Sequence, residues 1–112
     1  MDAPFRLRKI GHVVLRSRDL QRSVDFYTKA LGFKVSDVYG EDMMPGGMVF
    51  LRFNEDHHGI ALVGGMAGQA EKREMHHMAF EVSTLEEVFA AREHLRKHNV
   101  PIVFEGRRRA GV

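Results

Sequence analysis

The chain has 112 residues and a formal net charge of +2, with 44% hydrophobic and 29% charged residues, which indicates one globular domain of ordinary composition. It contains no cysteine, so disulfides, thiolate metal sites and thiol nucleophiles are excluded. No apolar run approaches the ~20 residues of a membrane span and no signal-peptide pattern opens the sequence. These absences predict a cytoplasmic protein with no membrane partner. The basic residues 107–109 are typical of a solvated tail, so we expect no nucleic-acid partner.

The first half of the chain predicts a strand, a helix and three further strands. Residues 9–16 are short, apolar and β-branched before a polar break, which is typical of a strand. Asp19 predicts the cap of a helix whose apolar residues recur on one face, and Gly32 predicts its end. The three strands that follow are predicted at residues 33–39, 48–53 and 59–63.

The second half predicts a shorter set of elements. Residues 64–74 are small and polar, which indicates a linker, and residues 75–82 predict a fifth strand. Thr84 and Glu87 have the spacing of a capping box and predict the start of a second helix. A sixth strand is predicted at residues 101–105.

The two halves form a repeat with an offset of 65 residues. This offset relates His12 to His77 (77 − 12 = 65) and Asp19 to Thr84 (84 − 19 = 65), and two matched βα units on one offset indicate an internal duplication. We therefore predict an α+β fold of two βαβββ modules within one domain over residues 1–112. Module one spans about 9–63 and a partial module two spans about 75–112. Copies of the third and fourth strands would fall beyond Val112, so we expect a chain truncated relative to its own repeat.

His12 and His77 are the predicted metal ligands. They hold equivalent positions in equivalent strands, so both imidazoles should point to the same side of the paired sheets, away from the helices. Imidazole is the likeliest metal ligand in a chain without cysteine, so we predict that the two residues bind one divalent metal ion. The alternate residues of these strands, expected to pack on the helices, are Val13, Leu15, Met78 and Phe80.

Two other histidines have a plainer interpretation. His94 and His98 fall on the second predicted helix among Arg92, Arg96 and Lys97. This composition is typical of a solvated helix face.

Three segments resemble the vicinal oxygen chelate superfamily. They are Gly11-His12-Val13-Val14-Leu15, residues 76–82, and a helix with the pattern Asp-x-x-x-Ser-x-x-Phe-Tyr-x-x-x-Leu-Gly-Phe over residues 19–33. The superfamily includes glyoxalase I, extradiol ring-cleaving dioxygenases, and bleomycin- and fosfomycin-resistance proteins. The resemblance covers essentially the whole chain and implies a cupped mixed sheet of paired βαβββ modules. The cup would hold a metal that chelates two neighbouring oxygens of the substrate.

The fourth predicted strand separates the branches of this family. Glyoxalase-like members carry a carboxylate ligand where this chain has Ala61. The segment His57-His58-Gly59-Ile60-Ala61-Leu62 is instead similar to extradiol dioxygenases, although Gly59 departs from their pattern. The resemblance implies that His58 is the active-site acid/base and that His57 binds substrate. The alternative is a hairpin-loop pair with no function.

The resemblance favours a metal-dependent extradiol-type dioxygenase, an oxidoreductase acting on a small catechol-like aromatic compound. A triad of two histidines and one carboxylate suits Fe(II), with Mn(II) and Zn(II) as alternatives. The family places the carboxylate in an eighth strand, which this chain does not contain. Two other functions remain open: a non-catalytic small-molecule binding protein of the bleomycin-resistance type, and a glyoxalase-like lyase or isomerase. Exposed sheet edges predict a homodimer.

Overall fold

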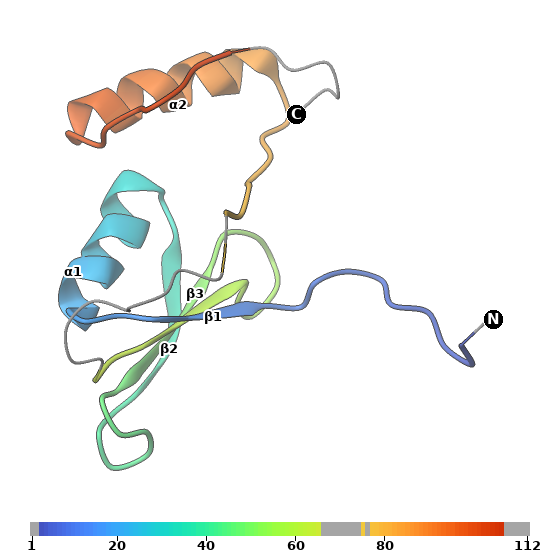
Figure 1. The fold of residues 1–112 in the computed structure, drawn as a ribbon, viewed down its shortest axis with the longest axis vertical. Coiled ribbons are helices and arrows are strands. Elements are labelled where there is room, and N and C mark those ends of the chain that lie inside the picture. The colour runs from blue at the N-terminus through green and yellow to red at the C-terminus, as the bar shows by residue number, and fades with distance from the viewer. Residues whose placement is uncertain (1–2, 66–74, 76, 107–112) are drawn as a thin grey trace.

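A computed structural model of the chain describes residues 3–65, 75 and 77–106 (Figure 1). Most of the predicted linker at 64–74 and the basic residues 107–109 therefore lie outside the described residues.

The first half folds as the predicted βαβββ module. A first strand is followed by a helix that continues as one π-helical stretch, and then by three strands. These elements are β1 (Val13–Arg16), α1 (Leu20–Asp25), η1 (Phe26–Ala30), β2 (Lys34–Tyr39), β3 (Met48–Arg52) and β4 (Ile60–Val63).

Local residue chemistry sets both ends of the first helical segment, as predicted. The Asp19 carboxylate accepts the backbone N–H of Arg22 at 3.1 Å and caps α1, which satisfies a donor that has no partner within the helix. Gly32 follows η1 with φ of +74°, a left-handed conformation that a side chain disfavours and that ends the helix.

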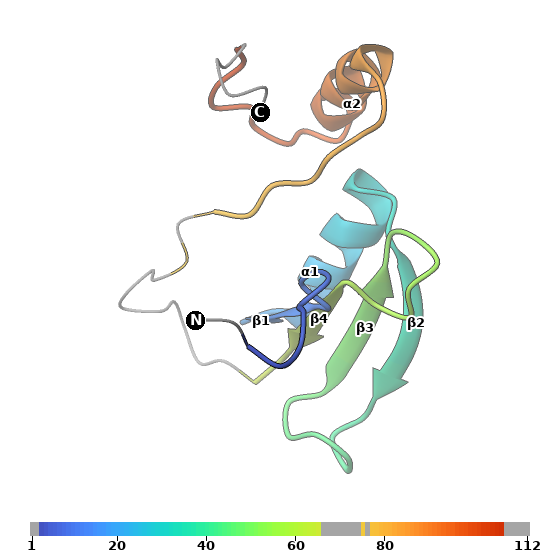
Figure 2. The same cartoon turned by 90° about the vertical axis from the view of Figure 1, so that its right-hand side faces the viewer.

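The four strands form one mixed sheet in the order β1-β4-β3-β2. β1 pairs in parallel with β4, in the register Val13↔Ile60. β4 pairs antiparallel with β3, and β3 with β2. Parallel strands need a long connection, and α1 with its continuation supplies part of it along one face of the sheet (Figures 1 and 2).

The hydrophobic core lies between that face of the sheet and the helical segment. Leu51, Ile60 and Leu62 are its largest fully buried side chains, contributed by alternate positions of β3 and β4. Leu15 packs against this cluster as predicted. The partly buried residues that complete the core are Leu20, Val24, Tyr27, Leu31 and Met78.

The opposite face of the sheet carries a row of residues in register. Val14 is paired with Ala61, Ala61 with Phe50, and Phe50 with Asp37. Because successive side chains of a strand alternate between faces, these residues point away from the core that contains Leu15, Ile60 and Leu51. We call this side the open face.

The second half contains the predicted helix, α2 (Leu85–Lys97). The Thr84 hydroxyl accepts the N–H of Glu87 at 3.2 Å, and the Glu87 carboxylate accepts the N–H of Ser83 at 3.2 Å, which is a capping box displaced by one residue. α2 lies beyond the end of η1 (Figure 1). No helix in the described part of the chain has the length and apolar character to cross a membrane.

The predicted strands at 75–82 and 101–105 are wrong, because the described residues there are not paired into any sheet. Among the described residues, β1 pairs with β4 and β2 pairs with β3, so β1 and β2 are the two edge strands of the sheet. A strand forms only where a neighbouring strand pairs with it, and the described residues of both segments lie outside the sheet of β1 to β4. The described residues form one four-stranded mixed sheet beside helices, which is consistent with the predicted α+β fold.

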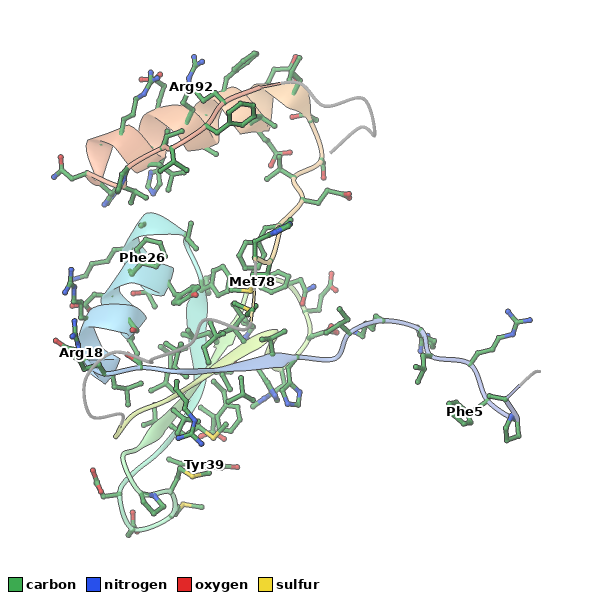
Figure 3. All side chains as sticks on the ribbon, in the orientation of Figure 1. Phe5, Arg18, Phe26, Tyr39, Met78 and Arg92 are labelled. Carbon is green, nitrogen blue, oxygen red and sulfur yellow. The ribbon has the colours of Figure 1, made fainter. Side chains whose placement is uncertain are left out.

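The extended segment 77–82 packs on the first module rather than on α2. Met78 contacts the core cluster (Figure 3), and the Phe80 ring lies 5.6 Å from the rings of both Phe33 and Phe53. The prediction that Met78 and Phe80 cover their own helix is therefore wrong. Most large apolar residues of α2, such as Phe89, are exposed.

The two halves do not close into a compact body. The radius of gyration is 16.4 Å, against about 13 Å for a compact domain of this length. The excess follows from the position of α2 and from the segment before β1, which extends away from the sheet (Figure 1).

Candidate functional site

The structure brings His12 and His58 together through the pairing of β1 with β4. The register Val13↔Ile60 places His12 beside Gly59, and the N–H of Val13 donates to the Gly59 carbonyl at 3.0 Å. The two imidazole rings then lie 4.6 Å apart between centroids, tilted by 48°. The parallel pairing of β1 with β4 therefore brings together two residues that are 46 positions apart in the sequence (58 − 12).

His57 extends this pair to a cluster of three. Its Nδ1 lies 2.9 Å from Nδ1 of His58, so one of the two nitrogens donates a hydrogen bond to the other. His57 is exposed, whereas His58 is partly buried. The pair therefore has an inner member beside His12 and an outer member at the surface.

Gly59 allows the loop that carries these histidines to pack closely. A Cβ at this position would lie 2.3 Å from Cε1 of Phe53, whose ring contacts Phe33 at 5.1 Å. A larger residue would force the Phe53 ring, which is 51% exposed, to shift. This contact is a physical reason for glycine where the dioxygenase pattern has a larger residue.

Phe50 forms an aromatic floor under the histidines on the open face. Its ring lies 4.8 Å from that of His58 in an edge-to-face arrangement and 6.0 Å from that of His57. Tyr39 packs on Phe50 from the neighbouring strand at 4.9 Å (Figure 3). A surface of aromatic rings with imidazole nitrogens at its edge suits a flat aromatic ligand with polar substituents.

The surroundings of His58 favour its neutral form. Partial burial lowers the pKa of its imidazole below the ordinary 6.5, and the neighbouring His12 and His57 lower it further, since each would repel a second positive charge. A neutral imidazole at neutral pH can accept a proton, which a general base must do.

An ion pair holds the segment before β1 against the histidine loop. Lys9 Nζ contacts the Asp56 carboxylate, and both side chains are largely exposed. Exposed pairs stabilise by less than about 1 kcal/mol, so this contact orients the segment that carries His12 more than it stabilises the fold. Sequence patterns did not indicate it, because the two residues are far apart in the chain.

His77 lies in the segment between the first module and α2 and is exposed. The described residues contain no group of three or more histidine, aspartate or glutamate side chains placed to hold a metal ion. Ligation by His12 and His77 therefore stays a prediction. The histidine that the structure brings to His12 is His58.

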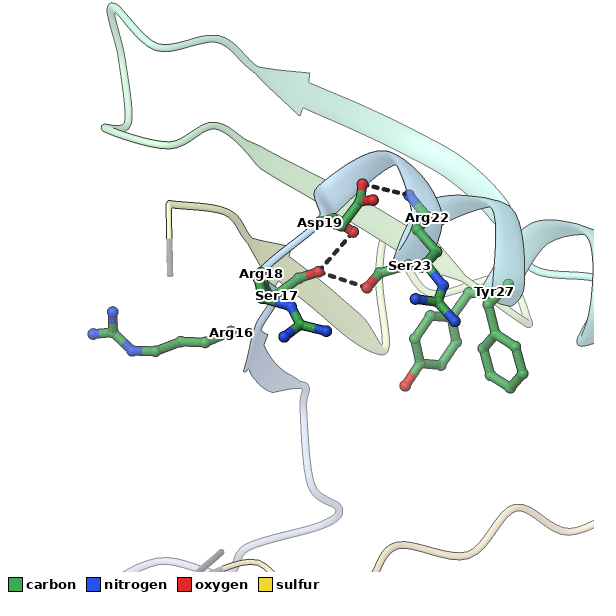
Figure 4. Close-up of a pocket in the computed structure, with 8 residues that line it drawn as sticks. Arg16, Ser17, Arg18, Asp19, Arg22, Ser23 and Tyr27 are labelled. Carbon is green, nitrogen blue, oxygen red and sulfur yellow. Dashed lines mark hydrogen bonds between the residues drawn. The ribbon is translucent and has the colours of Figure 1, made fainter. Parts of the chain in front are cut away.

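A separate cavity of about 410 Å³ lies beside the start of α1 (Figure 4). Three of its polar residues, Ser17, Asp19 and Ser23, are joined by hydrogen bonds. The Ser17 hydroxyl donates to the Asp19 carbonyl at 2.9 Å and lies 2.6 Å from the Ser23 hydroxyl. None of the predicted site residues lines this cavity. Its lining residues are Arg16, Ser17, Arg18, Asp19, Arg22, Ser23, Phe26 and Tyr27.

Comparison with known proteins identifies related sequences. Residues 9–111 match the model of the Glyoxalase/Bleomycin resistance protein/Dioxygenase superfamily. Metapyrocatechase 2 of Cupriavidus necator is 36% identical over 81 residues, which are 72% of this chain and 23% of that protein. Biphenyl-2,3-diol 1,2-dioxygenase of Paraburkholderia xenovorans is 39% identical over 82 residues, covering 70% of this chain and 26% of that enzyme. The chain thus spans about a quarter of the length of these relatives.

The solved structures agree with the sequence relatives on the fold. The trypanothione-dependent glyoxalase I of Leishmania major superposes with a TM-score of 0.67 and 29% identity over 94% of this chain and 75% of that one. The match of the family model over nearly all of the chain, together with the βαβββ module, shows that this chain belongs to the glyoxalase/bleomycin resistance protein/dioxygenase superfamily.

Proposed function

We propose that the chain acts in metal-dependent, extradiol-type ring cleavage of a small catechol-like compound. The observation that carries the proposal is the cluster of His12, His57 and His58 over the Phe50 ring on the open face. The similarity to two ring-cleaving dioxygenases supports the same reaction class. A catechol has a flat ring and acidic hydroxyl groups, so an aromatic surface beside a proton-accepting imidazole suits this substrate.

The proposed metal ligands are His12 and His77. Two imidazoles fit Fe(II), which we favour, and also Mn(II) and Zn(II). Imidazole is a suitable ligand type for these metals. The ligand set is incomplete, because no cluster of three such ligands exists among the residues that the structure describes. When bound, the metal would lower the pKa of a substrate hydroxyl.

The tautomers of the histidine pair follow from the proposed role of His58. If His58 accepts the substrate proton at Nε2, its Nδ1 carries a hydrogen and donates to Nδ1 of His57. His57 must then carry its own hydrogen on Nε2, which leaves that N–H directed away from His58. His57 is exposed and can donate this hydrogen bond to a substrate oxygen. One 2.9 Å contact thereby connects the acid/base role of His58 with the substrate-binding role of His57.

The resemblance to glyoxalase I supports a second candidate, a glyoxalase-like lyase or isomerase. Ala61 disfavours it. This residue lies on the open face between Val14 and Phe50 and offers no carboxylate where that branch of the family carries a ligand. A cup that binds a small molecule without chemistry is the third candidate, and it has no need of a neutral imidazole beside the ligand.

The proposal extends to the assembly. We place residues 1–112 in one two-module domain of a cytoplasmic homodimer, because β1 and β2 are the edges of the sheet and unpaired edges favour pairing between chains. Sedimentation velocity of the intact protein should give twice the monomer mass. A single monomeric species at micromolar concentration would contradict this part of the proposal.

Metal analysis tests the ligand assignment. His12→Ala or His77→Ala in the intact protein should abolish stoichiometric divalent-metal binding, because a site with few ligands loses most of its affinity with either one. His57→Ala is the matched control and should keep the metal. Equal occupancy in the wild type and the His12→Ala/His77→Ala double variant would refute the assignment.

Steady-state kinetics with a panel of catechols tests the reaction. His58→Ala should keep metal and substrate affinity while turnover falls by about 10²–10⁴-fold, the usual contribution of a general acid–base group. Loss of the metal would instead make His58 a ligand. Unchanged turnover would remove its role. If the wild-type protein cleaves no catechol but binds one, the non-catalytic cup replaces the enzyme.

A further inference from the structure

The last turn of α2 carries a second pair of histidines outside the proposed site. His94 is followed four residues later by His98, the C-cap of the helix. Residues with this spacing lie on the same face of a helix. The two rings are 4.4 Å apart between centroids and tilted by 44°. Both side chains are exposed, as the sequence predicts. Their approach to each other, however, is closer than a merely solvated helix face requires.

His94 is also in contact with the first module. Its Nε2 lies 3.2 Å from the backbone carbonyl oxygen of Lys29, in the last turn of η1, where carbonyls lack partners within the helix. When the Nε2–H of His94 donates to this oxygen, Nδ1 retains its lone pair. A backbone carbonyl that accepts the second ring N–H is a common support of metal-binding histidines, since it fixes the tautomer and orients the ring.

The position favours a cation. The C-terminal ends of α2 and η1 meet here, and helix C-termini carry partial negative charge. The nearby Arg96 is neutralised by the carboxylates of Glu93 and Glu105, at 3.2 Å from each. These contacts leave Lys97 as the main opposing charge on this part of the helix.

The geometry and the donor type select the class of metal. Zn–N bonds of about 2.0–2.1 Å in a tetrahedral arrangement place two ligating nitrogens about 3.4 Å apart. Rings with centroids 4.4 Å apart can reach this separation by rotation about their side-chain bonds. Imidazole ligands prefer borderline ions such as Zn²⁺, Ni²⁺ and Cu²⁺ over Ca²⁺ and Mg²⁺. With two side-chain ligands, water completes the coordination.

We propose that His94 and His98 bind a borderline divalent transition-metal ion, of which Zn²⁺ is the representative. Binding also holds α2 against the end of η1, because it uses the neutral His94 tautomer whose Nε2–H donates to Lys29. An ion that binds only this arrangement stabilises it in proportion to its affinity and concentration. The site does not include His12 or His77, so it can be tested separately from the proposed enzyme activity.

Calorimetric titration of the intact protein with Zn²⁺ tests the site. His12→Gln/His77→Gln serves as the background, because it removes the proposed catalytic ligands. In this background, His98→Gln should weaken Zn²⁺ binding at least roughly tenfold, the lower end of what loss even of an outer-shell partner costs a metal site. The matched control R96H/H98R keeps the composition and moves the second imidazole to the opposite side of the helix. It should bind Zn²⁺ as weakly as His98→Gln.

Hydrogen exchange tests the connection to η1. Saturating Zn²⁺ should slow exchange of the η1 amides as well as the α2 amides in the His12→Gln/His77→Gln background and leave both unchanged when His98→Gln is added. Circular dichroism verifies that α2 is retained in each variant. Equal Zn²⁺ affinity with and without His98 would overturn the proposal. Tight binding without slower exchange would overturn the link to η1.

Discussion

The charge of one imidazole, that of His58, depends on the side chains that the fold gathers around it. Burial is the largest cause of its lowered pKa, and His12 and His57 add to it. Lys9 and Asp56 are paired with each other nearby and contribute little net charge. The neighbours therefore act together to disfavour the protonated form of His58. The direction in which its pKa changes when one neighbour is removed can thus be predicted.

We expect His12→Gln to raise the pKa of His58 toward 6.5 in the metal-free protein. Glutamine cannot carry positive charge, so protonated His58 loses one source of repulsion. Burial remains, so the pKa should still lie below that of an exposed histidine. Proton NMR of the His58 ring as a function of pH measures the change. His98→Gln, a substitution on α2, is the control and should leave the titration as it is. A pKa that falls or stays fixed in His12→Gln would contradict the electrostatic account.

At the scale of elements, the capping residues determine where α2 begins. Most of its large apolar side chains are exposed, so packing supplies little of its stability. The contacts of Thr84 and Glu87 at the first turn therefore matter more than they would in a buried helix.

Thr84→Ala should therefore destabilise α2 by about 1 kcal/mol, because it removes the acceptor of the Glu87 N–H. The loss should appear as faster hydrogen exchange over residues 85–97, with β3 and β4 unchanged. Ser83→Ala is the matched control, since Ser83 contacts Glu87 through its backbone N–H and keeps that group. If both variants exchange alike, the cap does not govern this helix.

The sequence predicted those features whose causes are local. Asp19, Gly32 and Thr84 set helix ends through contacts within a few residues, and the strands of the first module were found from their alternation and turns. The strands at 75–82 and 101–105 were wrong because a strand depends on a distant partner. The approach of His12 to His58 was not foreseen for a similar reason. It follows from the parallel register of β1 and β4, which no short pattern encodes.

At the scale of the whole molecule, contacts between described residues join the halves. Met78 and Phe80 pack on the core of the first module, and His94 reaches the carbonyl of Lys29. Residues 29 and 94 are themselves related by the repeat offset (94 − 29 = 65). Equivalent positions of the two modules therefore meet, as do residues near the axis of a two-fold symmetric dimer.

Phe80→Ala should loosen segment 77–82 from the first module. It removes two aromatic contacts, each 5.6 Å between ring centroids, and should cost about 1–2 kcal/mol, in line with the value of such pairs. Limited proteolysis should then cleave this segment faster. Val103→Ala is the control, because Val103 is 96% exposed and surface substitutions change stability by less than about 0.5 kcal/mol. Equal cleavage of the two variants would mean that Phe80 does not anchor the segment.

The pairing of β1 with β4 has a consequence for the order of folding. β2, β3 and β4 follow one another through connections at residues 40–47 and 53–59, whereas β1 pairs with a strand 47 residues away (60 − 13). Contacts between distant residues form late, because the entropy of closing the loop must be overcome first. We expect β1 to join the sheet after the β2–β3–β4 meander has formed. His12 would then reach His58 in the final stage, so the proximity of these two rings reports that the first module has finished folding.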